Sequence, residues 1–588
     1  MQLSDSRRLT GPSLLLGEPG AVLDVAIGAA DPDLPERLVE TWSVRLREML
    51  GAVGWDDRRH FSRRHATGAS LAVSAPIDAL YAATEINEWA LAAALSDLRG
   101  EAPDESAAAA AARLRSAIES ESNPPLLRLR DAADRRGVMF LSDDEFASVG
   151  MGAGSLTWPV GLLPDPEAVP WDDVHDVPLV MVTGTNGKTT TVRLLAAMVT
   201  AAGRTPGFSS TDGVFVGGDL LDAGDYSGPG GARTVLRDRR VEAAVLEVAR
   251  GGMLRRGLGA PRADGVLVTN VGVDHLGEYG LHDIQQLADA KMVIARAVER
   301  GGVLVLNADD PVLAGRRAPG EARLVWISRE PGAGPVQEHL ASGGTAVVVE
   351  DDAFVRRIGS NETGLIPVDE VPVTLGGLAT YNVSNVLGAV ALAPSLGIAD
   401  EAIARALAAF LPGAEDLPGR TNVFRFGGVT AIVDFAHNPH GMDALASLVR
   451  RLPAGRRLVV IGQAGDRDDD SIRALTRAAL GMRPDHVIVK ELVRYLRGRE
   501  PGEVPDLICG ELAAAGSGVR VSRIDGETAA VRAALEWAAP DDVLVFPIQV
   551  ERGRVTELLA HLEETGWSAG DPVPEIPGHF EPFAGEQT

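Results

Sequence analysis

Residues 182–191 have the composition of a loop that binds phosphate groups. The segment reads V-T-G-T-N-G-K-T-T-T, follows an apolar run and precedes apolar residues at helical spacing. In such loops glycines let the backbone approach the phosphates, Lys188 reaches the outer phosphates and the Thr189 hydroxyl can bind Mg²⁺. A purely structural glycine turn is the alternative, but it would not require the Lys-Thr pair. We therefore predict that a nucleoside triphosphate is bound by Gly184, Thr185, Asn186, Gly187, Lys188, Thr189 and Thr190.

Two further strand-like runs end in side chains that suit a metal ion or a phosphate group. The first run, 244–248, contains Glu247, and a carboxylate at the end of a parallel strand faces the ligand crevice, where it can bind Mg²⁺. The second run, 268–276, ends in polar residues that include His275, which could bind a second metal ion or a phosphate. A solvated glutamate and a structural histidine are the alternatives, and the phosphate loop favours the metal for Glu247.

Composition limits the classes of function that the chain can have. Its 588 residues, 45% of them apolar, are enough for three or four domains. The formal net charge of -26 argues against sequence-independent binding of nucleic acid. Cys509 is the only cysteine, the first ten residues lack the apolar core of a signal peptide, and no apolar run reaches about 18 residues. We expect a cytoplasmic protein without a membrane span.

Alternation of apolar runs with helical patterns divides the chain into five parts. Residues 1–100 mix helices with strands, which we expect at 14–16 and 22–27. Short β-rich runs recur between helices in two later blocks, which predicts two α/β domains with parallel sheets. The expected parts are a small α+β domain (1–100), a helical and linker region (101–172), a central nucleotide-binding α/β domain (173–412), a C-terminal Rossmann-like α/β domain (413–569) and a poorly ordered tail (570–588).

The phosphate loop resembles that of the Mur ligases, ATP-dependent enzymes that join amino acids to carboxylates. As in that family, only two residues separate Gly184 from Gly187. Other segments match motifs of the family in the same order. They are Glu247 at a strand end, T-N-x-x-x-D-H at 269–275, Lys291, N-A-D-D at 307–310, Asn382 within 381–385, the P-G-R that ends at Arg420, and the D-F-A-H-N-P that begins at Asp434.

The resemblance implies a Mur-type central domain that uses ATP and Mg²⁺. It implies that Lys291, carbamylated in much of the family, helps His275 to hold a second Mg²⁺. By the same match, the segment with Asn382 contacts adenine, Arg420 contacts the γ-phosphate and Asp434 contacts the ribose. Tyr381 replaces the histidine that usually precedes this asparagine.

Several segments resemble, more specifically, the Mur-like domain of cyanophycin synthetases, which attaches arginine to aspartate in a poly-aspartate backbone. Among them are T-D-G-V at 211–214 and E-V-A-R-G-G-M-L-R at 247–255. Residues 8–12 and 77–98 more weakly resemble the N-terminal domain that docks the polymer in those enzymes. The interval 101–172 is too short for the ATP-grasp domain that they carry. We therefore expect one ligase activity rather than two.

The resemblance implies a carboxylate-amine ligase that forms an amide or isopeptide bond through an acyl phosphate. The expected acceptor is an aspartyl or other acidic peptide-like molecule, and the amine belongs to an amino acid. Candidate substrate-binding residues are Arg233, Arg237, Arg250 and Arg255 for the acid and Asp466, Asp468 and Glu491 for the amine. Leu492 stands where a second acidic residue is expected, so the sequence leaves open whether arginine is the amine.

Two further questions remain open at this point. The alternative function is a catalytically weak ATP-binding subunit that docks or regulates a separate cyanophycin-type synthetase. A homo-oligomer is compatible with the sequence. Because Mur ligases close their C-terminal domain over ATP, we also expect a hinge near 413–419.

Overall fold

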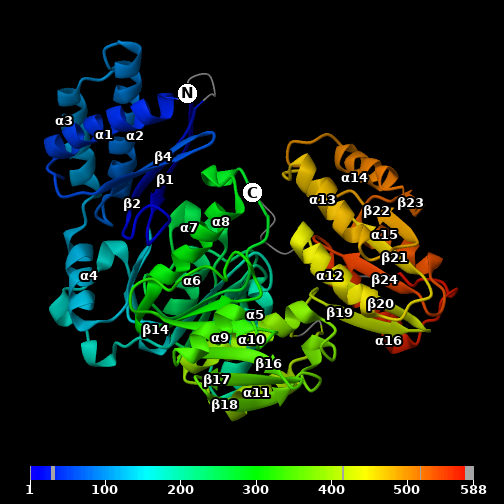
Figure 1. Ribbon diagram of the computed structural model, residues 1–588. Coiled ribbons are helices and arrows are strands. Elements are labelled where there is room, and N and C mark those ends of the chain that lie inside the picture. Colours follow the sequence, from blue (N-terminus) through cyan, green and yellow to red (C-terminus); the bar gives the residue numbers. More distant parts are fainter. Residues whose placement is uncertain (1, 28–32, 414–415, 517, 576–588) are drawn as a thin grey trace.

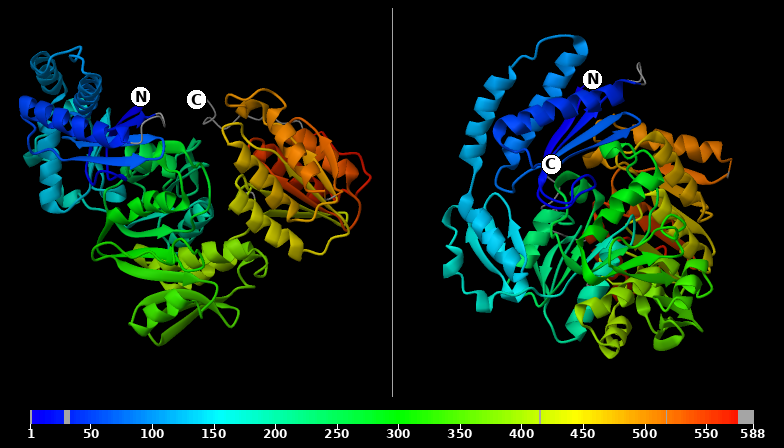
Figure 2. Two further views of the ribbon diagram at one scale, coloured as in Figure 1. Left: turned by 45° about the horizontal axis from the view of Figure 1, so that its top comes forward. Right: turned by 60° about the vertical axis from the view of Figure 1, so that its left-hand side comes forward.

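The protein has three main bodies, of which the C-terminal one is a separate lobe (Figures 1 and 2). The structure is a computed structural model that describes residues 2–27, 33–413, 416–516 and 518–575. Most of the tail expected at 570–588 lies outside these residues. Within the described part of the chain, no helix is both long enough and apolar enough to cross a membrane.

The N-terminal body is an antiparallel sheet covered by helices. Its strand order is β1-β2-β4-β3, with β1 Gln2–Leu9, β2 Gly20–Ala26, β3 His60–His65 and β4 Gly68–Ser74. Helices α1 Leu34–Val53, α2 Leu80–Arg99 and α3 Ala107–Glu121 share one apolar core with this sheet. The prediction of a strand at 14–16 is wrong. These residues form a turn in which the Ser13 amide donates to the Leu16 carbonyl over 2.7 Å.

Residues 101–172, expected to be a helical and linker region, contain two α-helices and three short strands. Its first helix, α3, packs on the N-terminal body. Helix α4 Pro124–Arg136 then packs beside an antiparallel sheet of three short strands, around a small core that includes Leu129 and Val149. These strands are β5 Phe140–Ser142, β6 Phe146–Val149 and β7 Leu156–Pro159.

The central body is built on an 11-stranded sheet. The strand order is β11-β10-β9-β12-β8-β13-β14-β15-β16-β17-β18, parallel from β9 to β16 and antiparallel at both edges. The parallel strands are β8 Leu179–Thr183, β9 Pro206–Ser210, β12 Ala243–Glu247, β13 Ala263–Val268, β14 Val298–Asn307, β15 Arg323–Ser328 and β16 Thr345–Glu350. The edge strands are β10 Gly213–Val216, β11 Asp219–Ala223, β17 Ala353–Ile358 and β18 Asn361–Pro367.

Helices cover both faces of this sheet. Along β8, Leu179 and Met181 enter one apolar core while Val180 and Val182 enter the other, because successive strand residues point to opposite faces. One face carries α6 Pro229–Arg237, α7 Arg250–Arg256, α8 Ile284–Lys291 and α9 Gly334–Ala341. The other carries α5 Lys188–Ala201, α10 Thr380–Leu392 and α11 Asp400–Ala409.

The C-terminal body is a smaller doubly covered sheet of order β19-β20-β24-β21-β22-β23. Only β19 is antiparallel to its neighbour. The strands are β19 Asn422–Phe426, β20 Val429–Asp434, β21 Arg457–Ile461, β22 His486–Val489, β23 Arg520–Arg523 and β24 Val543–Pro547. Helices α12 Pro439–Arg451, α13 Asp469–Leu480 and α14 Glu503–Ala514 lie on one face, and α15 Glu527–Trp537 and α16 Arg552–Thr565 on the other.

This arrangement confirms the predicted fold class of two α/β domains preceded by a smaller α+β domain. The two large domains are joined by the segment after α11, part of which, 414–415, lies outside the described residues. The expected hinge at 413–419 and the domain boundaries stay predictions.

Candidate active site

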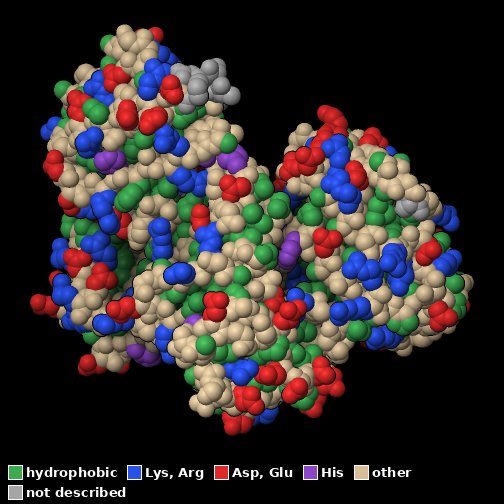
Figure 3. Space-filling view, in the orientation of Figure 1, with side chains coloured by type: hydrophobic (Ala, Val, Ile, Leu, Met, Phe, Trp, Pro, Cys, Tyr) green, Lys and Arg blue, Asp and Glu red, His purple; other side chains and the backbone are tan. Residues whose placement is uncertain are grey.

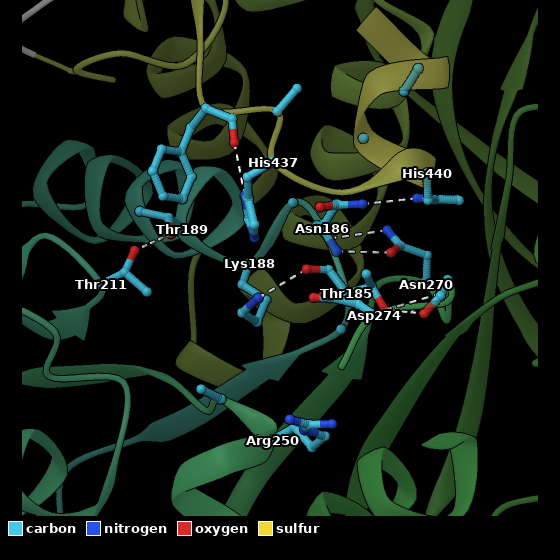
Figure 4. A pocket seen from close by; sticks show the side chains of 18 of the residues that line it. Thr185, Asn186, Lys188, Thr189, Thr211, Arg250, Asn270, Asp274, His437 and His440 are labelled. Carbon is cyan, nitrogen blue, oxygen red and sulfur yellow. Dashed lines mark hydrogen bonds between the residues drawn. The ribbon is translucent and has the colours of Figure 1, made fainter. Parts of the chain in front are cut away.

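The predicted phosphate loop connects β8 to α5, at the end of the sheet where parallel strands open into a crevice. Gly187 has a φ of 85°, and a Cβ there would lie 2.1 Å from Oδ1 of Asn385, so a side chain would collide. The hydroxyl of Thr269, after β13, donates to the Asn186 carbonyl over 2.6 Å. The Lys188 amine donates to the Thr185 carbonyl over 3.1 Å, which folds it over the loop (Figure 4).

Glu247, at the end of β12, lies beside this loop. The Thr189 hydroxyl donates to its Oε2 over 2.7 Å, whereas Oε1 is buried and has no hydrogen-bond partner. Burial raises the pKa of Glu247, and the charges of Lys188 and Arg420 oppose that rise. An orphaned carboxylate oxygen beside a hydroxyl fits a hard cation such as Mg²⁺. No cluster of three His, Cys, Asp or Glu side chains suited to a metal occurs within the described residues.

A second pair of predicted residues, His275 and Lys291, lines the same cavity. Lys291 is buried, and desolvation together with the charge of Lys188 lowers its pKa to about 7, against the opposing effect of Asp274. Nδ1 of His275 lies 2.6 Å from Oε1 of Glu278. His275 therefore has one ring nitrogen engaged by its own loop.

The N-terminal body contacts the loop after His275. The Arg63 side chain donates to the Gly280 carbonyl, and the Thr67 hydroxyl lies 3.2 Å from Nε2 of His282. The Arg7 guanidinium lies 5.1 Å from the ring centroid of Tyr279, which lines the cavity. The β3–β4 hairpin and β1 thus support one rim of the site.

The C-terminal domain supplies the facing wall. Asp434 accepts from the Thr421 amide over 2.9 Å and from its hydroxyl over 3.1 Å. Burial raises the pKa of Asp434, and these hydrogen bonds oppose the rise. Across from it, Asn382 on α10 donates to the Val373 carbonyl over 2.9 Å, and the hydroxyl of Tyr381 lies 2.7 Å from that of Thr421.

Asp212, in the turn between β9 and β10, connects the two walls. Three arginines surround its carboxylate: Arg193 of α5 at 3.6 Å, and Arg420 at 3.5 Å and Arg552 at 3.0 Å from the C-terminal domain. Burial alone would raise the pKa of Asp212, but the three guanidinium groups outweigh burial and lower it to about 2. The carboxylate is therefore ionised throughout the neutral range.

A second junction between the domains joins Asn186 of the phosphate loop to the start of α12. Asn186 and Asn438 exchange two side-chain hydrogen bonds of 3.1 and 3.0 Å. Nδ2 of Asn186 also lies 2.9 Å from Nδ1 of His440, as Figure 4 shows. Both junctions are therefore formed by polar or charged side chains.

The two walls enclose one large cavity of about 1140 Å³. The surface is hollowed between the same two lobes (Figure 3). The predicted residues that line it are Gly184, Thr185, Asn186, Gly187, Lys188, Thr189, Thr190, Glu247, Arg250, Arg255, His275, Lys291, Asn382, Arg420 and Asp434. A smaller cavity of about 200 Å³ beside it is lined by Asp274, His437, Asp466, Arg467 and Asp468, among others.

The remaining predicted substrate residues lie elsewhere. Arg233 is partly buried and donates to the Thr10 hydroxyl over 2.7 Å, and Arg237 forms an ion pair with Asp143. The two arginines thus contact segments that precede the central domain, and the sequence spacing did not indicate these contacts. Glu491 accepts from the Gly502 amide over 2.6 Å and does not line either cavity. Asp468 caps α13 by accepting from the Ser471 amide over 2.8 Å, although it also lines the smaller cavity.

The cluster formed by Asp212, Arg193 and Arg552 had not been predicted. Asp212 belongs to a segment that carried the resemblance, but no role followed from it. Arg552 lies at the start of α16 and 340 positions from its partner Asp212, without a local motif that could have indicated it. In the sequence, Arg193 has no feature that distinguishes it from an ordinary surface arginine of a helix.

Comparison with known proteins gives matches over most of the chain. Residues 182–393 match the model of the Mur ligase middle domain, and residues 419–547 match that of the Mur ligase glutamate ligase domain. A cyanophycin synthetase of Synechocystis sp. is 38% identical over 377 residues, 64% of this chain and 43% of the relative. A UDP-N-acetylmuramoyl-L-alanyl-D-glutamate–2,6-diaminopimelate ligase of Alkalilimnicola ehrlichii is 30% identical over 428 residues, 71% of this chain and 78% of the relative.

The match to the cyanophycin synthetases is partial, because the chain spans less than half of their length, 43% in the case of Synechocystis. Among solved structures, that of E. coli FolC in complex with ADP, without folate substrate, matches at 20% identity with a TM-score of 0.47. The match covers 77% of this chain and 97% of that chain.

Proposed function

Because the chain belongs to the Mur ligase superfamily, whose members form amide bonds, we propose that it is an ATP-dependent ligase. It joins the carboxylate of an acidic amino acid or peptide to the amine of an amino acid. The observation that carries this proposal is the single cavity in which the phosphate loop and Glu247 face Arg420 and Asp434 of the second domain. ATP lies between the domains, with its phosphates on the loop, its ribose at Asp434 and its adenine near Asn382.

The reaction requires activation of the acid, because a carboxylate does not react with an amine at neutral pH. A carboxylate oxygen attacks the γ-phosphorus, a new P–O bond forms, and the bond to ADP breaks. The product is an acyl phosphate. The amine nitrogen then attacks the acyl carbon, the C–N bond forms, inorganic phosphate leaves and the amine loses a proton. One ATP is converted to ADP and phosphate for each amide bond.

The side chains around the loop have the charge that this step needs. Lys188 and Arg420 neutralise phosphate oxygens while two anions approach each other, which is where electrostatic stabilisation contributes most. Thr189 and Glu247 are the residues that would hold Mg²⁺, and bound Mg²⁺ supplies further neutralisation of phosphate oxygens.

A second metal position is proposed at His275 and carbamylated Lys291. A carbamate forms only on a neutral amine, and the pKa of about 7 that burial gives Lys291 makes a large neutral fraction available near pH 7. The orientation of His275 toward Glu278 means that its other ring nitrogen would serve this site.

The lining of the two cavities supports the proposed substrate classes. Arg250 and Arg255 line the large cavity and suit an acidic acceptor. The smaller cavity, with Asp466, Arg467 and Asp468, suits the charged ends of an amino acid. The similarity to cyanophycin synthetases favours aspartyl acceptors. Arginine as the amine lacks support, because Glu491 is engaged with Gly502 outside both cavities.

The test is phosphate release by the purified protein with Mg-ATP, with aspartyl peptides and poly-aspartate screened against each amino acid. Lys188→Ala is the control. The proposal requires release that depends on one acid-amine pair, and a product whose mass is the sum of the pair minus water. ATP binding without stimulation by any pair would contradict the ligase and favour a subunit that docks to a separate cyanophycin-type synthetase.

A further inference from the structure

Arg552 lines the large cavity, but the reaction described above gives it no role. It is the first residue of α16 and donates to Oδ1 of Asp212 over 3.0 Å. Its guanidinium lies 4.7 Å from the ring centroid of Phe435, and that of Arg420 lies 5.0 Å from the same ring. Arg552 and Arg420 thus share both an aromatic ring and a carboxylate.

The backbone before Arg420 is shaped to admit Arg552. Gly419 has a φ of 67°, and a Cβ built there would lie 2.8 Å from Cδ of Arg552. A side chain at 419 would therefore collide with the side chain of Arg552. Arg552 thus packs against the backbone of the P-G-R segment that carries Arg420.

Buried groups inside the C-terminal domain fix the segment that leads into Arg552. Glu527 accepts from the amides of Gln549, Val550 and Glu551 over 2.8, 2.8 and 2.6 Å. The amine of Lys490, fully buried, donates to Glu527 and to Oε1 of Gln549, the latter over 2.8 Å. The start of α16 is therefore held in place without any ligand.

The arginine pair lies close to the phosphate loop. Nη2 of Arg420 donates to the Thr211 hydroxyl over 3.1 Å, and that hydroxyl lies 3.2 Å from the Thr189 hydroxyl. One hydroxyl group, that of Thr211, thus lies between Arg420 and Thr189, the residue that would hold Mg²⁺. Three guanidinium groups share the one carboxylate of Asp212, which is 5% exposed, so this corner of the cavity has an excess of positive charge and suits an additional anion.

We propose that Arg552 is a second catalytic arginine, which contacts the outer phosphate of ATP together with Arg420. This inference rests on the proposed ligase function. Asp212 holds both guanidinium groups next to the phosphate loop while no nucleotide is bound. When ATP enters, the γ-phosphate replaces Asp212 as the partner of the two arginines, and their charge is then available while the phosphoryl group moves from ADP to the acceptor carboxylate.

The experiment compares the affinities of ATP and ADP in the full-length protein, without acceptor or amine, for the wild type, Arg552→Ala and Arg552→Lys. Arg554→Ala, on the same helix and outside the cavity, is the matched control. Loss of a contact to the γ-phosphate lowers ATP affinity by about 10-fold or more and changes ADP affinity by less than about 2-fold. Arg552→Lys keeps the charge and is expected to regain part of the loss.

A purely structural role for Arg552 predicts a different result. If Arg552 only ties the domains together, Arg552→Ala and Asp212→Asn weaken ATP and ADP equally, and this outcome overturns the proposal. Under the proposal Asp212→Asn does not lower the preference for ATP, because it removes only a competitor for the arginines. An unchanged preference for ATP in Arg552→Ala also overturns it.

The same measurement separates this inference from the proposed function. If the wild type shows no ATP binding that depends on Lys188, both fail. If the wild type binds ATP through Lys188 and Arg552→Ala keeps the ATP preference, only the role of Arg552 fails. Turnover with an active acid-amine pair gives the second readout, and Arg552→Ala is expected to lower kcat by about 100-fold.

Discussion

The two walls of the cavity are built in different ways. The wall of the phosphate loop belongs to one domain, and its functional groups follow directly from the ends of β8 and β12, so backbone geometry places them. The facing wall includes two long side chains, Arg420 and Arg552, that cross a domain junction to reach Asp212. One wall is therefore fixed before any ligand binds, and the other is held by ion pairs that a polyanion can replace.

The largest expected effect comes from a change in the wall of the phosphate loop. Lys188→Ala is expected to lower amine-dependent turnover by about 1000-fold, equivalent to about 4 kcal/mol of transition-state stabilisation. The free energy of unfolding is expected to stay within about 0.5 kcal/mol of the wild type, because within the described part of the chain the amine donates one hydrogen bond, to the Thr185 carbonyl. Phosphate release and urea unfolding measure the two quantities, and a large loss of stability would show that this wall is not preformed.

The next effect concerns the support of the facing wall. Glu527→Gln leaves the charge of Lys490 buried without its carboxylate and is expected to lower the free energy of unfolding by about 3 kcal/mol. Glu557→Gln, at an exposed position of α16, is the control and is expected to have little effect. Urea denaturation followed by far-UV circular dichroism measures both. Equal stability of the two variants would show that the buried Lys490–Glu527 pair does not stabilise the fold.

A smaller effect tests the ion pairs between the walls through pH. The folded pKa of Asp212, about 2, is below its ordinary value of 3.8, so its contribution is complete above about pH 4 and is lost as the pH falls through 2. The difference in unfolding free energy between the wild type and Asp212→Asn is expected to shrink by about 2 kcal/mol between pH 5 and pH 2. Exposed Asp219→Asn on β11 should show no such change, and a pH-independent difference for Asp212→Asn would refute the assignment.

The smallest effect concerns the junction at Asn438. Asn438 caps α12 by accepting from the Gly441 amide over 2.8 Å, and it also donates to Asn186 over 3.0 Å. Asn438→Ala is expected to cost about 1 kcal/mol of stability through loss of the cap. Asn438→Asp keeps the cap but not the donation, so it should retain most of the stability, and thermal unfolding distinguishes the two variants. Similar losses in both would mean that the contact with Asn186 dominates.

The difference between the walls also explains what the sequence could predict. The phosphate loop and Glu247 were identified because their signals are local: a strand, a turn and a helix lie within a few residues of each other. Arg420 and Asp434 were assigned only through the family resemblance. Asp212 and Arg552 meet through the orientation of two domains, which no periodicity or spacing encodes.

Similar reasons account for the other differences. Arg233 looked like a free cation, but the N-terminal segment folds back and its Thr10 hydroxyl accepts from that side chain. The three short strands between 140 and 159 lie among prolines and glycines, and strands of three or four residues are too short for an alternating pattern to be recognised. In contrast, the run predicted at 244–248 lies close to the observed strand β12, Ala243–Glu247.

The contacts of Arg63 and Thr67 with the loop at 280–282 give the N-terminal body a thermodynamic link to the cavity. That loop begins at His275 and carries Tyr279 on the cavity wall. A molecule bound to the β3–β4 hairpin and a molecule bound in the cavity both interact with the same short segment. If the first binds one arrangement of the segment more tightly, reciprocity requires that the second change the affinity of the first by the same factor.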